Sequence, residues 1–180
     1  SSDFVIVTKE SEFFAAPNSS KGSAQAAAES GIAAAVCDDD KAAIEKARDL
    51  VNILPVNNLA PVPMFEFADA APSASGDYKA VISSVADADS EIELYAEFGT
   101  EAYTGFVTVG GSTVGVAYAG KNSGKLTSDD CMKLARFVRT CDAFSIPVVS
   151  FVDSEGFADA DAVSAIKAMT TLANSYAEAT

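Results

Sequence analysis

Two carboxylates, Asp153 and Glu155, are the side chains best placed to do chemistry in this sequence. They follow the apolar run at 147–152, which is typical of a strand covered on both faces. In open α/β sheets ligands bind beyond the carboxyl ends of the strands, so one interpretation makes this turn the wall of a ligand site. The other is an ordinary surface turn in which Gly156 adopts a left-handed conformation. The residues themselves leave both interpretations open.

A glycine-rich stretch at 120–125, GKNSGK, invites comparison with a phosphate-binding P-loop. A P-loop has four residues between its glycines and a Ser or Thr after its lysine, whereas this stretch has three residues and then Leu126. It therefore predicts a solvated loop between a strand and a helix. The other glycine-rich stretch, 110–115, lacks the dinucleotide-binding spacing and favours a hairpin turn.

Histidine is absent from the sequence, which excludes Ser-His-Asp and Cys-His catalysis and His-ligated zinc. Cys131 and Cys141 fall in an apolar helical pattern, so we expect both to fill the core rather than act as nucleophiles. The acidic run 38–40 favours the start of a helix, with Asp40 as its N-cap, over a cation site. We assign no catalytic residue and no metal ligand from these patterns.

The excess of acidic over basic residues limits the classes of partner that the chain can bind. The chain has 180 residues, 26 Asp plus Glu against 12 Lys plus Arg, and a formal net charge of −14. Such a charge repels phosphate backbones and anionic lipid, so neither nucleic acid nor a membrane surface is expected as a partner. No apolar run approaches the roughly 20 residues of a membrane helix, and the first residues do not resemble a signal peptide. Three unpaired-looking cysteines indicate a reducing compartment, and we predict a cytoplasmic protein.

Hydrophobic periodicity places these residues on an α/β framework. Strands are predicted at 4–8, 91–98, 106–109, 113–119 and 147–153, and helices at 40–54, 77–86, 127–144 and 161–176. The proline-rich segment 61–76 is the best linker. Three helices have predicted inward faces, made by Ile44, Ala47, Val51 and Leu54, by Met132, Ala135, Phe137, Val138, Cys141 and Phe144, and by Val163, Ile166, Thr170, Ala173 and Tyr176.

One long string is more specific than any of these patterns. Residues 133–157, KLARFVRTCDAFSIPVVSFVDSEGF, closely resemble a segment of the carboxyltransferase subunits of biotin-dependent acyl-CoA carboxylases and decarboxylases. That family segment reads K-x-A-R-F-V-R-x-C-D-x-F-x-I-P, then an apolar strand, then V-D-x-P-G-F. Gly105-Phe106 and 114–117 are similar to the family's hairpin. Three earlier stretches are similar to stretches near the end of the family's first domain: SSDFVIVTKES at the start of the chain, residues 30–33 and residues 54–58.

The resemblance implies an incomplete ClpP/crotonase-like spiral fold that spans the end of one domain and the start of the next. Residues 1–60 would end the first domain, 61–76 would be the linker, and 77–180 would begin the second. The implied chemistry is carboxylate transfer between carboxybiotin and a short acyl-CoA, with biotin on a partner carrier protein, the biotin carboxyl carrier protein. Sister carboxyltransferase subunits in a homo-oligomer are the other implied partners. The substrate-side or biotin-side candidates are Ala119, Gly120, Asp153, Ser154, Glu155, Gly156 and Phe157.

Departures from the family pattern limit this expectation. Glu155 stands where the family has proline, and Tyr118-Ala119-Gly120 stands where many members have Ala-Asn-Gln. In the family, both oxyanion holes lie outside the matched segments, so we expect the isolated chain to be an inactive fragment. The competing hypotheses are a stand-alone structural or assembly module and a crotonase-like acyl-CoA hydratase or hydrolase.

Overall fold

The computed structural model describes residues 4–11, 22–70, 76–122 and 124–180. The element order is β1 (Ile6–Thr8), α1 (Ala24–Glu29), β2 (Ala35–Cys37), α2 (Asp40–Ile53), α3 (Tyr78–Ser83), β3 (Ile92–Leu94), β4 (Ala102–Val109), β5 (Ser112–Ala119), α4 (Ser128–Ala143), β6 (Val148–Val152) and α5 (Val163–Glu178). The predicted α/β class is confirmed. The strand β2, which pairs in parallel with β1, was not anticipated.

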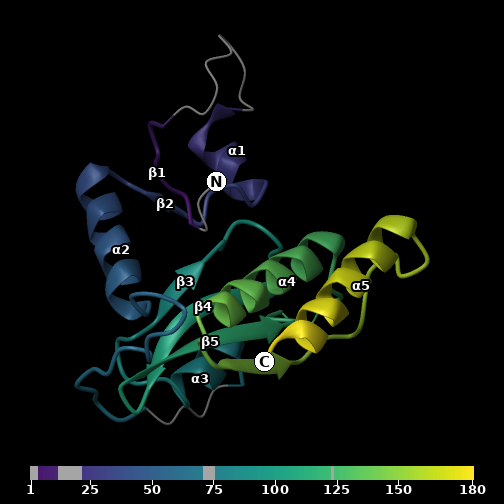
Figure 1. The fold of residues 1–180 in the computed structure, drawn as a ribbon. Helices are drawn as coiled ribbons and strands as arrows, with labels where there is room; N and C mark the ends of the chain where they lie inside the picture. The colour runs from purple at the N-terminus through teal and green to yellow at the C-terminus, as the bar shows by residue number, and fades with distance from the viewer. Residues whose placement is uncertain (1–3, 12–21, 71–75, 123) are drawn as a thin grey trace.

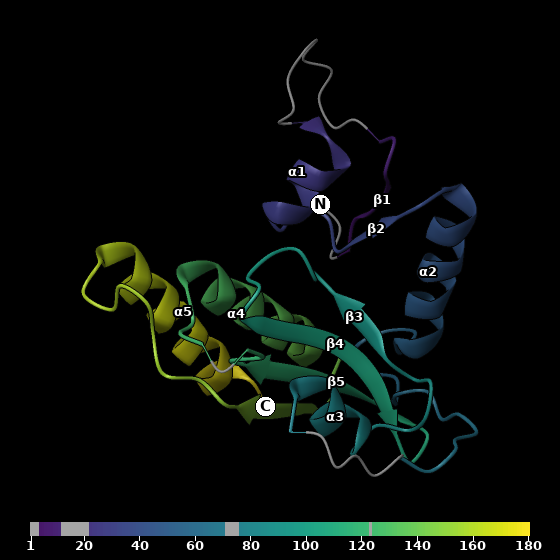
Figure 2. The same ribbon diagram turned by 180° about the vertical axis from the view of Figure 1, so that it is seen from behind.

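The main sheet has the order β3-β4-β5-β6, in which only the β5–β6 pair is parallel. Helices α4 and α5 lie on one face of it and α3 on the other, while α2 stands beside it (Figure 1 and, from behind, Figure 2). Because side chains alternate across a strand, Phe106 of β4 packs in the cluster with α4, and Tyr103 and Val107 pack in the cluster with α3.

The β4–β5 hairpin is the predicted one, with longer strands. Gly110 and Gly111 both have positive φ, which a two-residue turn between twisted strands needs. The carboxylate of Asp87 accepts hydrogen bonds from both glycine N–H groups, at 2.9 and 2.8 Å. Burial alone would raise the pKa of Asp87, but these bonds and one from Thr108 outweigh it and lower the pKa. A distant carboxylate thus fixes the turn.

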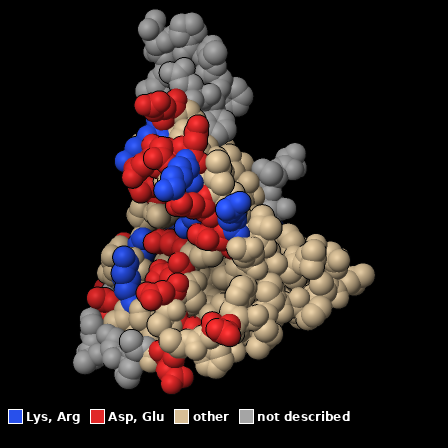
Figure 3. Space-filling view, turned by 90° about the vertical axis from the view of Figure 1, so that its left-hand side faces the viewer, with Lys and Arg blue, Asp and Glu red and all other residues tan. Residues whose placement is uncertain are grey.

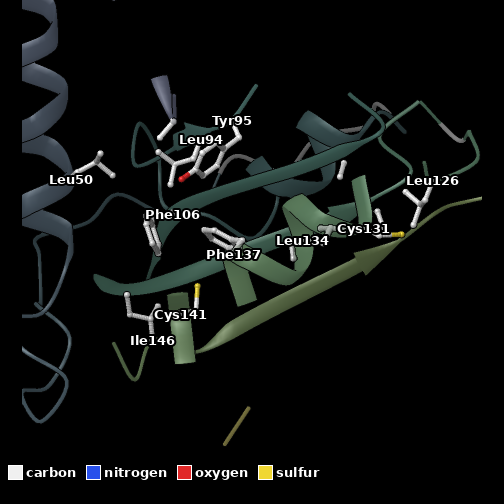
Figure 4. Close-up of a cluster of buried hydrophobic side chains, with 14 of the residues drawn as sticks. Leu50, Leu94, Tyr95, Phe106, Leu126, Cys131, Leu134, Phe137, Cys141 and Ile146 are labelled. Carbon is white, nitrogen blue, oxygen red and sulfur yellow. The ribbon is translucent and has the colours of Figure 1, made fainter. Parts of the chain in front are cut away.

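Helix α4 supplies the centre of the core. Its start is the predicted capping box, in which Thr127 and Asp130 cap each other's backbone N–H groups. Phe137 meets Phe106 of the sheet with ring centroids 5.3 Å apart, in the middle of the cluster drawn in Figure 4. Cys131 and Cys141 are buried there, and burial raises their pKa values to about 11 and about 12. The expectation that both fill the core is confirmed, because both side chains are buried in this cluster. Their raised pKa values disfavour the thiolate that a nucleophile needs near neutral pH.

Several inward faces were predicted wrongly. In α2, Leu50 and Ile53 are buried, whereas Ile44, Ala47 and Val51 are exposed. In α5, all five predicted inward residues are exposed: Val163, Ile166, Thr170, Ala173 and Tyr176. Instead Ala165, Ala168 and Ser175 are buried, because small side chains let α5 approach α4 closely. Met132 of α4 is also exposed, and Phe144 is only partly buried.

Three local expectations also need correction. The N-cap of α2 is Asp39, whose carboxylate accepts from Ala42 N at 2.8 Å, and not Asp40. The predicted strand 91–98 ends at Leu94, because Tyr95 takes a left-handed conformation that turns its side chain into the core. Strand β6 is not covered on both faces, since Val152 is 79% exposed.

The proposed linker, 61–76, is without a helix or strand over its described residues 61–70 and 76. Met64 makes an isolated bridge to Ser112, and Phe65 N donates to Gly111 O at 2.8 Å. The segment is therefore held against the hairpin tip. Residues 71–75 lie outside the described residues, and the division into domains stays a prediction.

Two buried charges of α4 hold the start of β4. Asp130 Oδ1 accepts from Glu101 N at 2.9 Å and from Ala102 N at 3.0 Å. Lys133 Nζ donates to Ala102 O at 2.7 Å and to Gly99 O at 3.3 Å. Burial of Lys133 lowers its pKa from 10.5 to about 8. The ammonium therefore carries a desolvation cost that the two carbonyls only partly offset.

This cost predicts an unusual pH dependence. Between pH 8 and 10.5 the unfolded chain binds more protons at Lys133 than the folded chain does, so the Lys133 contribution makes stability rise with pH in this window. Relative to Lys133→Met, the wild-type free energy of unfolding should gain roughly 2 kcal/mol from pH 7.5 to 9.5 in urea titrations. Cysteines and tyrosines titrate in both proteins and cancel. An unchanged difference between the two proteins would refute the shifted pKa.

Candidate functional site

The parallel pairing of β5 and β6 brings the predicted site residues together. Ala119 and Val152 are register partners at the carboxyl ends of these strands, and Asp153 N donates to Ala119 O at 2.8 Å. Ala119-Gly120 therefore lies directly against the turn 153–157. We call these two segments the strand-end site. The turn thus lies beyond the carboxyl ends of two parallel strands, which is the position that the ligand-wall interpretation requires.

Gly120 is required where the two segments meet. Its φ is +88°, and a Cβ atom there would lie 2.1 Å from Asp153 O. Gly156 also has a positive φ, +107°, as the surface-turn interpretation requires, but open space surrounds it. Close backbone approach thus explains Gly120, whereas conformation alone explains Gly156.

Ser154 organises the turn from within. Its Oγ lies 2.9 Å from Gly124 O and 3.0 Å from Gly156 O, and it accepts from Gly156 N at 3.1 Å. Leu126 and Phe157 form a parallel bridge beside it. The turn is therefore tied to the loop that precedes α4. The carboxylate-bearing residues Asp153 and Glu155 are exposed on its outer side.

Glu101 connects the two segments of the strand-end site, and the sequence analysis missed it. Its carbonyl accepts from Gly120 N at 2.9 Å and Lys121 N at 2.8 Å. Its carboxylate accepts from Asn122 Nδ2 at 2.9 Å and from Gly124 N at 3.3 Å. Gly124 O in turn accepts from Glu155 N at 3.2 Å. No local spacing signals this role, because Glu101 is about twenty residues from the loop it holds.

Three aromatic side chains that the sequence patterns did not point to pack together beside the strand-end site, on the side of the sheet where α3 lies. Tyr118 stacks on Phe151 at 5.7 Å between ring centroids and meets Tyr78 edge-on at 6.0 Å. Lys121 Nζ lies 5.5 Å from the centroid of the Tyr78 ring, within cation–π range. These side chains come from β5, β6 and α3. They give the strand-end site a mainly apolar floor on one side.

The hydrogen bonding limits what the strand-end site can do. The N–H groups of Gly120, Lys121, Gly124, Glu155 and Gly156 all donate to protein acceptors. An oxyanion hole needs preorganised donors aimed at the developing charge, and these amides are already engaged. The turn can therefore form a wall beside a ligand, but these five amides do not form an oxyanion hole.

The described part of the chain has neither a cluster of metal-ligating side chains nor a membrane-spanning helix. No group of three or more Asp, Glu or Cys residues there is arranged to hold a metal ion. Within the same residues, no helix is long and apolar enough to cross a bilayer.

Comparison with known proteins identifies relatives over most of the sequence. Residues 13–180 match the family described as carboxyl transferase domain. The propionyl-CoA carboxylase beta chain of Cereibacter sphaeroides is 34% identical over 144 residues, covering 71% of this chain and 28% of that protein. The methylmalonyl-CoA decarboxylase subunit alpha of Propionigenium modestum is 32% identical over 144 residues, with the same two coverages.

A solved structure agrees with these relatives. The transcarboxylase 12S hexamer, described with methylmalonyl-coenzyme A and methylmalonic acid bound, superposes with a TM-score of 0.88 at 29% identity. The match covers 99% of this chain and 41% of that one. The chain thus spans less than half the length of the proteins that it resembles.

Removing the Glu101 carboxylate should loosen the loop without unfolding the protein. Glu101→Ala loses two charge-assisted hydrogen bonds, so we expect about 1–2 kcal/mol of lost stability and faster amide exchange at Gly124. Gly120 and Lys121 should stay protected, since they bond to the backbone carbonyl. NMR hydrogen exchange measures all three amides. Equal effects from the control Glu10→Ala, at an exposed residue, would contradict the role of Glu101.

The two glycines of the strand-end site should respond differently to alanine. Gly120→Ala adds a clash with Asp153 O to the cost of a positive φ, and we expect a loss above about 2 kcal/mol. Gly156→Ala bears only the conformational cost, about 1 kcal/mol. Urea unfolding of both variants compares them directly. Losses of equal size would show that the close approach at Gly120 is unimportant.

Proposed function

This chain belongs to the carboxyl transferase domain family, and from this premise we propose that it forms part of a carboxyltransferase that moves carboxylate between carboxybiotin and a short-chain acyl-CoA. The acyl group is of the propionyl or methylmalonyl type. The observation that carries the proposal is the extent of the match, residues 13–180 in sequence and 99% of the chain in structure. The names of the matched relatives supply the substrate class.

The parent fold in this proposal is a crotonase-like spiral, of which residues 1–60 end one domain and 77–180 begin the next. The order β5-α4-β6-α5 supports the second part, because strands and helices alternate there with both helices on one face. Within the first part, Val7, Ala24, Ala27, Ala28 and Ala33 form a small cluster of their own, while Ala34, Leu50 and Ile53 join the main core. The family pattern makes 61–76 the connection between them.

In the proposal, the strand-end site borders the reacting groups rather than activating them. The N–H groups of Gly120, Glu155 and Gly156 are engaged, so the proposal places the donors for a thioester enolate or for the biotin ureido oxygen elsewhere. Gly156 presents backbone without a side chain to open space, which allows a flat group to approach, whereas the missing side chain of Gly120 makes room for the backbone of Asp153. Glu101 and Ser154 hold the two segments in register, and Asp153 and Glu155 set a negative charge at the rim.

Partners follow from the same family. We propose that biotin arrives on a biotin carboxyl carrier protein, that acyl-CoA is the substrate, and that sister carboxyltransferase subunits form a homo-oligomer in the cytoplasm. The transcarboxylase 12S structure is described as a hexamer, which supports the oligomer. The net charge of −14 argues that this chain alone contributes little to binding the phosphates of CoA.

A segment graft tests the proposed function. The part of this chain that aligns with the Cereibacter sphaeroides propionyl-CoA carboxylase beta chain, 71% of its length, would replace the matched segment of that protein. We expect biotin-dependent carboxylation of propionyl-CoA that is reduced by about 10²-fold, since misplacing reacting groups by about 1 Å costs that much. The ungrafted enzyme and a graft with Gly156→Ala are the controls, and the latter should be slower still. Circular dichroism and gel filtration establish folding and assembly.

Other outcomes favour the other hypotheses. A folded graft without biotin-dependent transfer would overturn the proposal in favour of a structural or assembly module. If the 180-residue chain itself hydrated an enoyl-CoA or hydrolysed an acyl-CoA without biotin, the crotonase-like hydratase or hydrolase would be correct. We expect the chain alone to turn over neither propionyl-CoA nor methylmalonyl-CoA.

A further inference from the structure

A groove between α4 and α5 differs in charge from the rest of this acidic chain. The two helices lie side by side (Figure 1), and the cavity between them has a volume of about 410 Å³. Arg136 and Arg139 line it together with Thr140, Thr171 and apolar or small side chains such as Met132. No Asp or Glu is among its lining residues. Its volume lies within the range of small-molecule sites.

Charge is distributed differently elsewhere on the molecule. On the face where α2 stands, acidic side chains surround the lysines and arginines (Figure 3). Across the chain, 26 acidic residues oppose 12 basic ones. The lining of the groove thus has two guanidinium groups and no acidic side chain, and Glu178 beside it is the carboxylate that Arg139 meets. Because Arg136 and Arg139 are three residues apart on a helix, both lie on the same side of α4.

Arg136 is held in place before any ligand arrives. Its Nη1 donates to Gly31 O at 2.8 Å, and its guanidinium carbon lies 4.8 Å from the centroid of the Tyr95 ring. Little side-chain entropy remains to be lost at this residue when an anion enters the groove. Arg136 thus supplies a fixed positive charge at one end of the groove.

Arg139 is held only weakly. Its nearest carboxylate is Glu178 at the end of α5, with Nη2 3.6 Å from Oε2. The two side chains are 50% and 67% exposed, and an exposed ion pair of this kind contributes little free energy. A guanidinium binds phosphate through two parallel hydrogen bonds, which this pair lacks at its present distance. A phosphate group can therefore displace Glu178.

We propose that the α4–α5 groove is a binding site for a small organic phosphate. Arg139 contacts the phosphate, Arg136 adds a fixed charge, and Glu178 competes for Arg139. The side chain of Met132 and the small residues beside it accept the uncharged part of the ligand, since thioethers adapt to irregular apolar groups. The groove lies on the helical layer, apart from the residues of the strand-end site, and the proposal does not depend on carboxyl transfer.

Variants of two exposed residues, Arg139 and Glu178, test the proposal, because they should change the affinity for ADP in opposite directions. Isothermal titration of the 180-residue chain at low salt would use pyrophosphate and ADP as probes. We expect Arg139→Gln to weaken ADP binding at least tenfold, about 1.4 kcal/mol. Glu178→Gln should strengthen it severalfold by removing the competing carboxylate. Arg48→Gln, which removes an exposed arginine of α2, is the matched control and should have no effect.

Each remaining outcome decides for or against the proposal. Stronger binding of ADP than of pyrophosphate would support an organic phosphate. Binding of succinate as tight as that of pyrophosphate would overturn the assignment to phosphate. No saturable binding at millimolar probe, equal losses in Arg139→Gln and Arg48→Gln, or weaker binding in Glu178→Gln would overturn the site. Circular dichroism of each variant excludes unfolding as the cause.

Discussion

The pair of buried charges on the first turns of α4 is the interaction on which the rest of the structure depends. Asp130 accepts from the backbone of Glu101 and Ala102, and Lys133 donates to the carbonyls of Gly99 and Ala102. Removing either side chain leaves buried backbone groups at 99–102 without their hydrogen-bond partner, which is more costly than losing an exposed ion pair. The turn that leads into β4 is therefore fixed relative to the helix that covers the sheet.

That anchor extends to the strand-end site through Glu101. Asp130 holds the Glu101 backbone, Glu101 holds the loop at 120–124, and Gly124 O accepts from the turn at Ser154 and Glu155. Except for the bond from Asn122 to the Glu101 carboxylate, each step is a hydrogen bond to a backbone group, which fixes the positions of the segments. This order gives the edge of the sheet a defined shape although its exposed residues are polar and glycine-rich.

Helix α4 also separates the buried core from the groove beside α5. Its inner side, with Phe137 and Cys141, belongs to the core, while its outer side carries Arg136 and Arg139 beside α5. α5 packs on α4 through alanines and a serine, with Met169 and Leu172 partly buried against the core, while Val163 is 68% and Ile166 46% exposed. α2 shows the same arrangement, with Val51 73% exposed. A chain that spans 28% of its relatives' length thus has apolar faces that its own core does not use.

Local signals in the sequence determined which elements form. Thr127 and Asp130 specify the start of α4, Gly110 and Gly111 specify the hairpin, and the glycine at 156 specifies a positive φ, because caps and turns are settled by neighbouring residues. The motif at 133–157 determined the family. Periodicity could not decide which face of α2 or α5 is buried, since that depends on which neighbour the fold supplies. Nor could it find Glu101 or Asp87, whose hydrogen bonds join residues more than twenty positions apart. Only the tertiary structure brings such partners together, because chain folding and not sequence distance sets which polar groups meet.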